Sequence, residues 1–405
     1  MTTGSRAEST PGTPRLLRAL NERSLLAHLR RTGPTSRAQL ARDTGLSKVT
    51  VSVAMANLER AALVRAVGES SPGRGRVAVL YEADPTAGYV VGIDVGRAWV
   101  RCAVADLSGT IVGRRDVPNR ARSAGRLVAA VADLAREVVE GAGVTWEQVV
   151  HTLIGSPGVF NPASGRLLFA SNLPGWGRTG LVEALRLSLG PSVDVENDAN
   201  LAAVGERDCG AGAGVSTFVF VTVGTGVGMG IVVDGRLYRG ARGAAGEVAY
   251  LPVGADGGPG APPASGPDLR RRGMLEEATS ADAVVRTAAA LGMAGARSAQ
   301  AVFEAARRGD PIALEAVELE GRRLALAVGS VAAILDPELV VLGGGIGRNL
   351  DLLREPMARR LAQLAPLRPS IVVSHLGEDA VLRGAVATAL DLARDLVFER
   401  RAGSG

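Results

Sequence analysis

Phe218-Val219-Phe220-Val221-Thr222-Val223 runs into Gly224-Thr225-Gly226-Val227-Gly228-Met229-Gly230, and Ile231-Val232-Val233-Asp234-Gly235 follows. The first run is β-branched and aromatic and predicts a strand, and the glycine-dense segment predicts a turn into a second apolar strand. Because glycine occupies every second position from Gly224 to Gly230, one face of this strand pair carries no side chains there. A ligand or another backbone segment can then approach closely. The same pattern also suits a purely structural hairpin, so both interpretations stay open at this point.

Polar residues flank this glycine turn in the sequence. Glu196-Asn197-Asp198-Ala199-Asn200 lies upstream, and Gly246-Glu247 lies downstream. Carboxylates and amides beside a bare glycine turn are typical of sites that bind a polyol or a phosphate. The alternative interpretation is that these side chains cap neighbouring helices.

Length and composition indicate a multidomain protein of a reducing compartment. The 405 residues suffice for two or three domains with sizeable cores. The two cysteines, Cys102 and Cys209, imply no disulfide framework and fit a cytoplasmic location. No apolar run reaches the ~20 residues that span a bilayer, and the polar N-terminus lacks the apolar core of a signal peptide, so we expect no membrane partner.

The basic residues concentrate at the N-terminus. Residues 1–80 contain 13 Lys and Arg against five Asp and Glu, whereas the rest of the chain contains 33 basic and 36 acidic residues. A basic module on a slightly acidic body predicts that the first module alone binds a polyanion. A solvated basic surface is the alternative.

The N-terminal region has the pattern of a helix-turn-helix. Residues 1–14 are rich in Ser, Thr, Gly and Pro, which predicts a disordered arm, and residues 15–83 form the first predicted domain. Leucines at helical spacing predict a helix over 15–31. Ser36 and Ser47 are the predicted N-caps of two further helices, over 37–44 and 48–61, with Gly45 between them.

The third of these helices has the features of a DNA-reading helix. Its N-terminal half carries small polar residues and the only lysine of the chain, Lys48, and short side chains allow a helix to lie deep in the major groove. Two predicted strands, over 63–67 and 77–81, flank a Gly- and Arg-rich wing whose arginines can contact phosphates or the minor groove. We therefore predict a winged helix-turn-helix that binds a pseudo-palindromic, double-stranded DNA operator; a helical packing domain is the alternative. The candidate DNA-binding residues are Ser36, Arg37, Ser47, Lys48, Val49, Thr50, Ser52, Arg74 and Arg76.

The rest of the chain predicts two α/β lobes, over residues 84–203 and 204–405. Three strand-like runs followed by alternating helices and strands occur twice, and the first repeat begins with runs over 89–95, 99–107 and 111–117. Such a repeat suggests two lobes that face a cleft. The last predicted helix, over 379–400, is expected to pack back on the first lobe.

Six short motifs occur in order along this body: Ile93-Asp94-Val95-Gly96, Gly155-Ser156-Pro157-Gly158, Asn172-Leu173-Pro174-Gly175-Trp176, Asn197-Asp198-Ala199-Asn200, Gly224-Thr225-Gly226-Val227-Gly228 and Gly246-Glu247. Together they resemble the motifs of the ROK family of repressors, open reading frames and sugar kinases, and the resemblance extends over residues 15–395. The N-terminal domain makes the chain similar to the transcriptional regulators of that family, of the xylose and N-acetylglucosamine repressor type. The resemblance implies a two-lobed, actin-like ATPase fold related to ribonuclease H, and a homodimer or homotetramer.

The resemblance also implies site residues. In the sugar kinases of the family, the carboxylate at the position of Asp198 is the general base that accepts a proton from the sugar hydroxyl. The implied sugar-binding residues are Asn172, Asn197, Asp198, Glu247, Tyr250 and Glu276. The implied nucleotide site comprises Asp94, Gly96, Arg97, Gly224, Thr225, Gly226, Gly344 and Gly345.

One departure from the family pattern concerns the nucleotide. The first phosphate loop of the kinases reads Asp-x-Gly-Gly-Thr, but here it reads Asp94-Val95-Gly96-Arg97-Ala98. A glycine and a hydroxyl that would contact phosphate are therefore missing. We expect the nucleotide site to be degenerate and expect ATP and magnesium not to bind.

The second departure concerns the zinc site of the family. Its three thiolate positions hold Pro267, Leu269 and Met274, and its histidine position holds Tyr250. Without these ligands a thiolate-rich zinc site cannot form, so we expect no metal. In the family, the zinc fixes the loop that carries a sugar-binding glutamate, and the position of Glu276 is therefore an open question.

Three functional hypotheses follow. The leading one is a DNA-binding regulator of carbohydrate metabolism, most simply a repressor, whose degenerate kinase body senses a sugar or sugar derivative. The alternative is an active ATP-dependent sugar kinase with an appended DNA-binding domain, which Asp198 favours and Arg97 and Ala98 oppose. A third hypothesis, a ligand-blind regulator controlled by a protein partner, is opposed by the retention of Asn197, Asp198 and Glu247.

Overall fold

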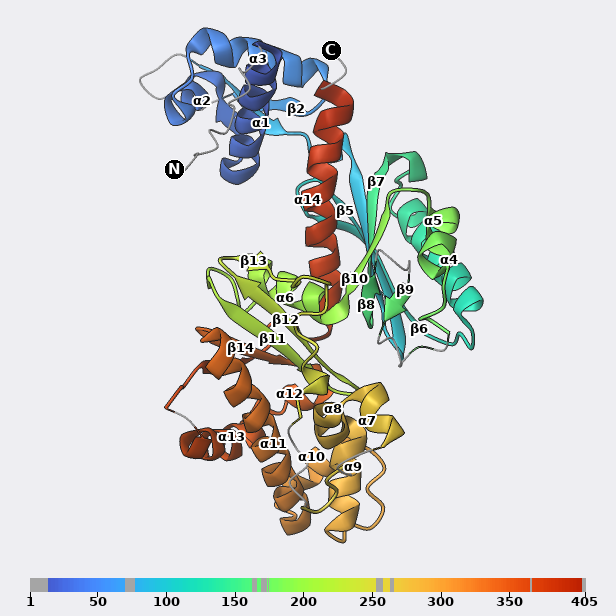
Figure 1. The fold of residues 1–405 in the computed structure, drawn as a ribbon. Coiled ribbons are helices and arrows are strands. Elements are labelled where there is room, and N and C mark those ends of the chain that lie inside the picture. Colours follow the sequence, from blue (N-terminus) through green and yellow to red (C-terminus); the bar gives the residue numbers. More distant parts are fainter. Residues whose placement is uncertain are drawn as a thin grey trace, which may run out of the picture.

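The computed structural model describes residues 14–69, 77–161, 166–168, 173, 175–252, 258–262, 266–364 and 366–402. Within them the chain forms an N-terminal head and two α/β lobes (Figure 1). The predicted wing arginines Arg74 and Arg76, the implied sugar ligand Asn172 and the expected arm up to residue 13 lie outside the described residues.

The head contains helices and a small antiparallel sheet. Ser36 and Ser47 cap α2 and α3 as predicted, because their hydroxyl oxygens accept hydrogen bonds from the backbone N–H groups of Gln39 (3.2 Å) and Thr50 (3.1 Å). Gly45 ends α2 with a φ of 72°, a left-handed conformation that glycine adopts without strain. The elements are α1 (Pro14–Thr32), β1 (Thr35–Ser36), α2 (Arg37–Thr44), α3 (Lys48–Arg60), β2 (Val64–Glu69) and β3 (Val79–Ala83), with the sheet order β1-β3-β2.

The leucines of α1 divide into a buried and an exposed set. In the C-terminal half of α1, Leu25, Leu26 and Leu29 are buried with Met55 and Leu58 of α3. In its N-terminal half, Leu16, Leu17 and Leu20 are about half exposed. Pro14 is the first residue of the helix rather than the last residue of the expected arm. Proline is tolerated there because the first backbone N–H groups of a helix have no partner within it.

The first lobe is built on a five-stranded sheet, in the order β10-β7-β4-β5-β6. Its elements are β4 (Tyr89–Val95), β5 (Trp99–Asp106), β6 (Ile111–Pro118), α4 (Ala124–Gly141), β7 (Val149–Ser156), β8 (Val159–Asn161), β9 (Arg166–Leu168), α5 (Leu181–Leu189) and β10 (Val193–Asn197), with short 3-10 helices at Pro85–Ala87 and Trp146–Gln148. In the described residues, β8 and β9 form a separate two-stranded ribbon.

The second lobe has its own five-stranded sheet, in the order β13-β12-β11-β14-β15. Its elements are α6 (Asp198–Cys209), β11 (Phe218–Val223), β12 (Val227–Val233), β13 (Arg236–Leu237), α7 (Pro267–Arg272), α8 (Met274–Thr279), α9 (Ala281–Ala290), α10 (Ala299–Arg307), α11 (Pro311–Leu335), β14 (Leu339–Gly343), α12 (Gly344–Gly347), α13 (Leu350–Leu364) and β15 (Ser370–Val373), with 3-10 helices at Val248–Tyr250 and Gly377–Asp379. The last element of the chain is α14 (Ala380–Ala402).

The two sheets share one strand pattern. In the first, β4, β5 and β6 form an antiparallel meander, and β7 and β10 run parallel to β4. In the second, β11, β12 and β13 form the meander, and β14 and β15 run parallel to β11. The structure therefore confirms the repeated strand order that the sequence predicts for two α/β lobes.

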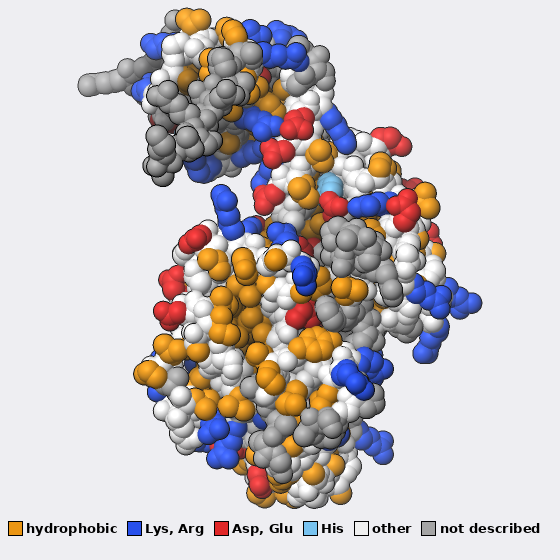
Figure 2. All heavy atoms as spheres, viewed as in Figure 1, with side chains coloured by type: hydrophobic (Ala, Val, Ile, Leu, Met, Phe, Trp, Pro, Cys, Tyr) orange, Lys and Arg blue, Asp and Glu red, His pale blue; other side chains and the backbone are white. Residues whose placement is uncertain are grey.

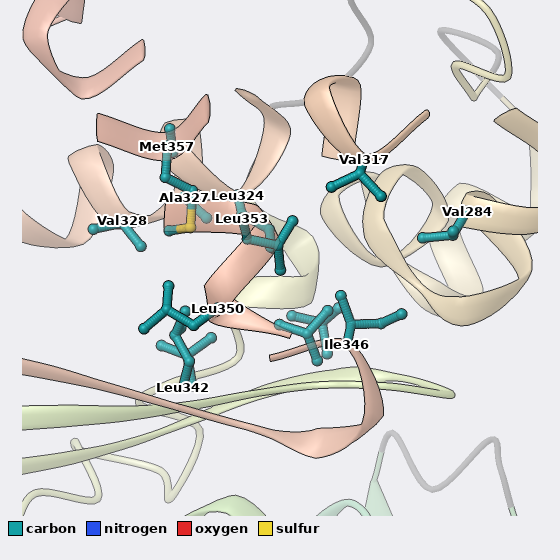
Figure 3. Packing of buried hydrophobic residues seen from close by; sticks show 14 of the residues in the cluster. Val284, Val317, Leu324, Ala327, Val328, Leu342, Ile346, Leu350, Leu353 and Met357 are labelled. Atoms are coloured by element: carbon teal, nitrogen blue, oxygen red, sulfur yellow. The ribbon is translucent and has the colours of Figure 1, made fainter. Parts of the chain in front are cut away.

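Alternate residues of β11 face different helical layers, as expected for a strand with a period of two. Val219, Val221 and Val223 belong to the core under α11 and α13, and Phe218 and Phe220 belong to the core under α6. Figure 3 shows the first of these cores, with side chains of α11, α12, α13 and β14 pointing toward one another. Each fully buried side chain of this size contributes roughly 1.5–3 kcal/mol, so the central strand stabilises both layers.

Helix α14 runs from the second lobe along the first lobe to the head (Figure 1). It packs on β4 and β7 and crosses α6. Two glycines lie at the crossing: a Cβ on Gly384 would be 1.8 Å from the carbonyl oxygen of Leu201, and a Cβ on Gly205 would be 2.4 Å from the carbonyl oxygen of Ala380. The two helices therefore touch backbone to backbone.

The C-terminal turns of α14 attach the body to the head. The guanidinium of Arg23 lies 4.9 Å from the ring centroid of Phe398, and Arg401 donates hydrogen bonds to the carbonyl oxygens of Ala62 (3.1 Å) and Ala87 (2.7 Å). One buried hydrophobic cluster extends from α1 and α3 through β4 to α14. The head is thus joined to the first lobe by packing as well as by the chain.

The structure places no lobe boundary between residues 203 and 204, where the sequence analysis expected one. Both residues lie inside α6, whose cap Asn197 ends a strand of the first sheet and whose body packs on β11 and β12 of the second. A single helix therefore belongs to both lobes. Among the described helices, none combines the length and the low polarity that a membrane crossing requires.

Replacement of Gly384 with valine tests the contact between α14 and α6. The valine side chain must displace α14 from the Leu201 carbonyl oxygen, so we expect the free energy of unfolding to fall by about 1–3 kcal/mol, as overpacking does. Gly125, in the first turn of α4, has no neighbouring atom within 4 Å of its Cβ position, which makes Gly125→Val the matched control. Urea denaturation followed by circular dichroism measures both variants, and equal stability of the two would contradict a tight crossing.

Candidate functional site

A cavity of about 370 Å³ lies between the two lobes. It brings together most of the implied sugar and nucleotide residues, which come from distant parts of the chain. From the sugar set it is lined by Asn197, Asp198, Glu247, Tyr250 and Glu276, and from the nucleotide set by Gly96, Arg97, Gly224, Thr225, Gly226, Gly344 and Gly345. Asp94 instead lines a neighbouring cavity of about 360 Å³, which Asp198 also lines.

Strand β10 and the start of α6 deliver two polar side chains to this cavity. Asn197 is the N-cap of α6, since its Oδ1 accepts a hydrogen bond from the N–H of Asn200 (3.1 Å) while its Nδ2 donates to the carbonyl oxygen of Gly158 (3.2 Å). One carboxylate oxygen of Asp198 accepts a hydrogen bond from the N–H of Ala199 (2.8 Å). Helix capping and a place in the cavity are therefore compatible for the same residues.

Glu247 and Tyr250 lie on the turn that follows Gly246. Gly246 has a φ of 93°, and a Cβ there would be 2.0 Å from the carbonyl oxygen of Met229, so only glycine lets this turn lie against β12. The Tyr250 hydroxyl donates a hydrogen bond to the carbonyl oxygen of Arg271 (3.0 Å). This bond ties the Glu247 turn to α7.

An arginine holds Glu276 at the cavity. Glu276 is 6% exposed; one of its carboxylate oxygens accepts a hydrogen bond from the N–H of Val227 (3.0 Å), and the other accepts one from Nε of Arg272 (2.9 Å). Arg272 also pairs with Glu277 (3.1 Å) and donates to the carbonyl oxygen of Thr225 (3.4 Å). The position of Glu276, which the sequence left open, is thus set by a backbone amide and a guanidinium.

The glycine turn between β11 and β12 has both roles that the sequence left open. Gly224 and Gly226 line the cavity, where the bare backbone is accessible. Gly230 lies under α6, and a Cβ there would be 2.4 Å from the carbonyl oxygen of Ala199. One end of the bare face therefore lines the cavity, and the other lies against a helix backbone.

On the first lobe, an arginine pairs with Asp94. Asp94 is 6% exposed, and Nη1 of Arg101 donates to its Oδ2 at 3.1 Å. Arg101 also pairs with Asp116 (3.6 Å) and Glu378 (2.7 Å). The β4–β5 turn presents Arg97, an exposed side chain that lines the interlobe cavity. The carboxylate of Asp94 therefore already has a cationic partner from the chain itself.

Burial raises the pKa of several carboxyl groups around the cleft. It raises the pKa of Glu247 from 4.5 to about 7, with further contributions from the charges of Asp198 and Glu276. It also raises the pKa of Asp198, against backbone hydrogen bonds that lower it. Burial raises the pKa of Asp94 to about 7, although the charge of Arg101 opposes this shift. Perturbed carboxyl groups that share a cleft are typical of functional sites.

The head presents the N-terminal half of α3 to solvent. Lys48 and its neighbours on the outer face are exposed, and Val49 retains 74% of its accessible surface. The Thr50 hydroxyl lies 2.9 Å from that of Ser47. The exposed candidates here are Ser47, Lys48, Val49 and Ser52. Figure 2 shows Lys and Arg side chains around the head.

Arg37 differs from the other candidate DNA-binding residues. It donates a hydrogen bond to Glu59 (2.6 Å), and its guanidinium lies 4.8 Å from the ring centroid of Tyr81. Its charge is therefore engaged in holding α2, α3 and β3 together.

Three further arginines line the interlobe cavity and were not selected from the sequence: Arg101, Arg271 and Arg272. Arg101 had a signal that was available, because a hairpin with its turn at residues 96–98 places it directly across from Asp94. The contact between Arg272 and Glu276 had a weaker signal, because the two residues have the i,i+4 spacing of a helical ion pair but lie on different helices separated by Gly273.

Comparison with known proteins identifies the family to which the two-lobed body belongs. Residues 90–392 match the family model named ROK family. The chain belongs to the ROK family. A glucokinase of Halalkalibacterium halodurans is 31% identical over 314 residues, which cover 73% of this chain and 93% of that protein. The xylose repressor of Bacillus subtilis is 25% identical over 389 residues, which cover 94% of this chain and 97% of the repressor. The similarity to the repressor therefore extends into the head.

Solved structures establish the fold of the ROK body. A ROK family transcriptional regulator, a homolog of the E. coli MLC protein, superposes with a TM-score of 0.77 at 21% identity and covers 96% of this chain and 100% of its own. The ROK hexokinase from Thermus thermophilus has a TM-score of 0.63 at 30% identity and covers 76% of this chain and 99% of its own. The body of this chain therefore has the two-lobed, actin-like sugar-kinase fold that the resemblance implied.

The two lobes differ in the residues that they would present to a nucleotide. On the second lobe, a Cβ on Gly224 would be 3.5 Å from the backbone nitrogen of Gly345, so two glycine segments meet without side chains. On the first lobe, Arg97 occupies the turn and Arg101 engages Asp94. For zinc the donor set does not fit, because no group of three or more His, Cys, Asp and Glu side chains gathers in the described part of the chain.

Replacement of Glu247 with glutamine tests its raised pKa. A carboxyl group whose pKa is higher in the folded state destabilises the fold when it ionises, so wild-type stability should fall as the pH rises from about 4.5 to about 7. Glutamine does not ionise. We therefore expect the free energy of unfolding of Glu247→Gln, relative to that of wild type, to rise by about 1–3 kcal/mol between pH 4.5 and pH 8. Urea denaturation at both pH values measures this gain.

The matched control is Glu183→Gln, at an exposed position on α5. Its stability relative to wild type should not change with pH. If the free energies of unfolding of Glu247→Gln and wild type differ by the same amount at both pH values, the raised pKa of Glu247 is wrong.

Proposed function

We propose that this protein is a DNA-binding transcriptional regulator of carbohydrate metabolism, a repressor whose kinase-like body senses a sugar or sugar derivative. One observation carries the proposal: the interlobe cavity keeps Asn197, Asp198, Glu247 and Glu276, while Asp94 on the nucleotide side is paired with Arg101. A body of this kind retains polyol recognition and lacks part of the phosphate-transfer machinery.

The head supports DNA binding through its helix geometry. We interpret α2 and α3, joined by residues 45–47, as a helix-turn-helix and β2 and β3 as the base of a wing. The exposed N-terminal half of α3 carries Lys48 and short polar side chains, which suit contacts with base edges in the major groove. A homodimer would present two such helices to the halves of a pseudo-palindromic operator.

The cavity supports recognition of a polyol. Each sugar hydroxyl can donate a hydrogen bond to a carboxylate or an amide oxygen, and Asn197, Asp198, Glu247 and Glu276 supply such acceptors from both lobes. A ligand that contacts both lobes favours the closed arrangement of the lobes. Because α14 contacts α6, the first lobe and the head, closure would be transmitted to the DNA-binding helices.

An active sugar kinase is the second candidate function. Asp198, which corresponds to the general base of the kinases, lies in the same cavity as the glycine turn, and glucokinases are among the relatives at 31% identity. We propose instead that ATP and magnesium do not bind productively, because Arg97 and Arg101 occupy the first-lobe side. We propose equally that no zinc is needed, because Arg272 holds Glu276.

Replacement of Lys48 with alanine tests the head. The operator is first enriched from a random DNA pool with the full-length protein, and affinity is then measured by fluorescence anisotropy. We expect Lys48→Ala to weaken binding by about 5- to 150-fold, the range for one lost base contact of roughly 1–3 kcal/mol.

The control for charge removal is Arg308→Ala, at an exposed position after α10 in the second lobe. Its operator affinity should equal that of wild type. If Lys48→Ala also binds like wild type and the preferred sequence is unchanged, α3 is not the reading helix.

Replacement of Asp198 with asparagine tests the sensor. Wild type should bind a sugar from a panel by calorimetry, release its operator and consume no ATP. We expect Asp198→Asn to bind the same sugar about 5- to 150-fold more weakly, because the amide NH2 group that replaces one carboxylate oxygen cannot accept a hydrogen bond from the sugar hydroxyl, at a cost of roughly 1–3 kcal/mol.

The control is Asp133→Asn, an exposed carboxylate of α4, which should respond to sugar as wild type does. A wild-type turnover near the ~10 per second typical of enzymes would replace the sensor with a kinase. If no sugar in the panel releases the operator and none gives a calorimetric signal, the sensor proposal is wrong.

A further inference from the structure

A larger cavity of about 860 Å³ adjoins the carboxylate-lined one. Arg97, Thr225, Arg271 and Arg272 line both, so the two cavities belong to one cleft. The inner cavity holds the carboxylates Asp198, Glu247 and Glu276, whereas the outer cavity has a different chemistry.

The outer cavity is strongly basic. It is lined by five arginines, Arg97, Arg120, Arg122, Arg271 and Arg272, and by one acidic residue of the described part of the chain, Asp282. Arg272 is neutralised by Glu276 and Glu277 and lies 3.8 Å from Asp282. The positive charge that remains is concentrated in a concave surface, where it raises the local concentration of anions.

Three of these arginines have no partner among the residues that the structure describes. In the described residues, the side chains of Arg97, Arg120 and Arg122 form neither an ion pair nor a hydrogen bond, and all three are exposed. Other arginines of the same lobe are paired: Arg101 with Asp94 and Arg114 with Asp379. The three side chains are therefore available to an external anion.

A single asparagine fixes the backbone that carries these three side chains. The N–H of Asn119 donates to the carbonyl oxygen of Ala98 (2.8 Å), and its Nδ2 donates to the carbonyl oxygen of Gly96 (2.8 Å). Its Oδ1 accepts a hydrogen bond from the N–H of Ala121 (3.2 Å). The turn with Arg97 and the segment with Arg120 and Arg122 are thus bound to each other and form one lip of the cleft.

From these observations, and resting on the proposed sensor function, we propose that the effector is an anionic carbohydrate. Its hydroxyl groups contact Asp198 and Glu247 in the inner cavity, and its phosphate or carboxylate group contacts Arg97, Arg120 and Arg122 in the outer one. Charge-assisted hydrogen bonds from guanidinium groups to such oxyanions are stronger than neutral ones, and they place the anion between the lobes. The charged group then contributes to lobe closure as well as to affinity.

The test compares neutral sugars with their charged forms on the full-length protein. The probes are glucose, N-acetylglucosamine and xylose, their terminal phosphates, and glucuronate, with ATP and inorganic phosphate as separate arms. Calorimetry gives the affinity, and anisotropy of labelled operator gives release. We expect one charged form to bind at least about tenfold more tightly than its neutral parent, and to lose that advantage in high salt.

Variants test whether the preference for the charged form depends on Arg97, Arg120 and Arg122, which we call the arginine lip. Arg97→Gln, Arg120→Gln and Arg122→Gln combined should remove the preference, so that the charged form binds this variant no more tightly than its neutral parent does. The control combines Arg236→Gln, Arg297→Gln and Arg308→Gln, which remove the same charge at exposed positions that line neither cavity. A preference that survives in the first triple variant, or disappears in the control, would overturn the assignment.

The outcomes separate this inference from the proposed function. If a neutral sugar releases the operator as effectively as its phosphate and uronate, the sensor stands and the anionic effector is wrong. If charged sugars bind through the arginines without releasing the operator, the anion site stands and the sensor is wrong. Tighter binding of ATP than of every charged sugar would identify the lip as a nucleotide phosphate site and overturn the proposal.

Discussion

The backbone contact between α14 and α6 is the constraint on which the rest of this structure depends. Gly205 and Gly384 allow the two helices to approach until main-chain atoms touch. The contact fixes α14 against the first sheet, and from there its last turns pack under the head. Because α6 begins at the cavity with Asn197 and Asp198, the same contact connects the polar floor of the cleft to the helix that reaches the head. The site and the head are thus attached to one pair of helices.

The cleft has an uneven charge distribution that its packing preserves. Carboxylates line the inner cavity, where burial raises the pKa of Glu247 and Asp198, whereas the outer cavity shares three of its arginines with the inner one and adds Arg120 and Arg122. Ion pairs between these arginines and carboxylates would neutralise both groups. Arg101 and Arg272 are already occupied by Asp94 and Glu276, and neither of them pairs with the other described carboxylates of the inner cavity, Asp198 and Glu247.

Sequence alone predicted the elements well and the contacts between them poorly. Strand β4 has its predicted bounds, Tyr89–Val95, because hydrophobic alternation and flanking turns are local signals. Most of the implied sugar and nucleotide residues line one cavity because their motifs lie at strand ends, where topology places them together. The boundary inside α6 was missed because a helix that serves two lobes has no break in its pattern. Arg272 has the i,i+4 spacing of a helical ion pair with Glu276, but Gly273 separates α7 from α8, so the spacing alone did not decide the contact.

The contact between Arg272 and Glu276 also has a chemical consequence. A guanidinium stays protonated over the whole physiological pH range, and neither oxidants nor chelators remove it from the chain. Thiolates that bind zinc are open to oxidation and depend on the supply of the metal. The contact that holds Glu276 in the cleft therefore depends on neither a thiolate nor a metal ion.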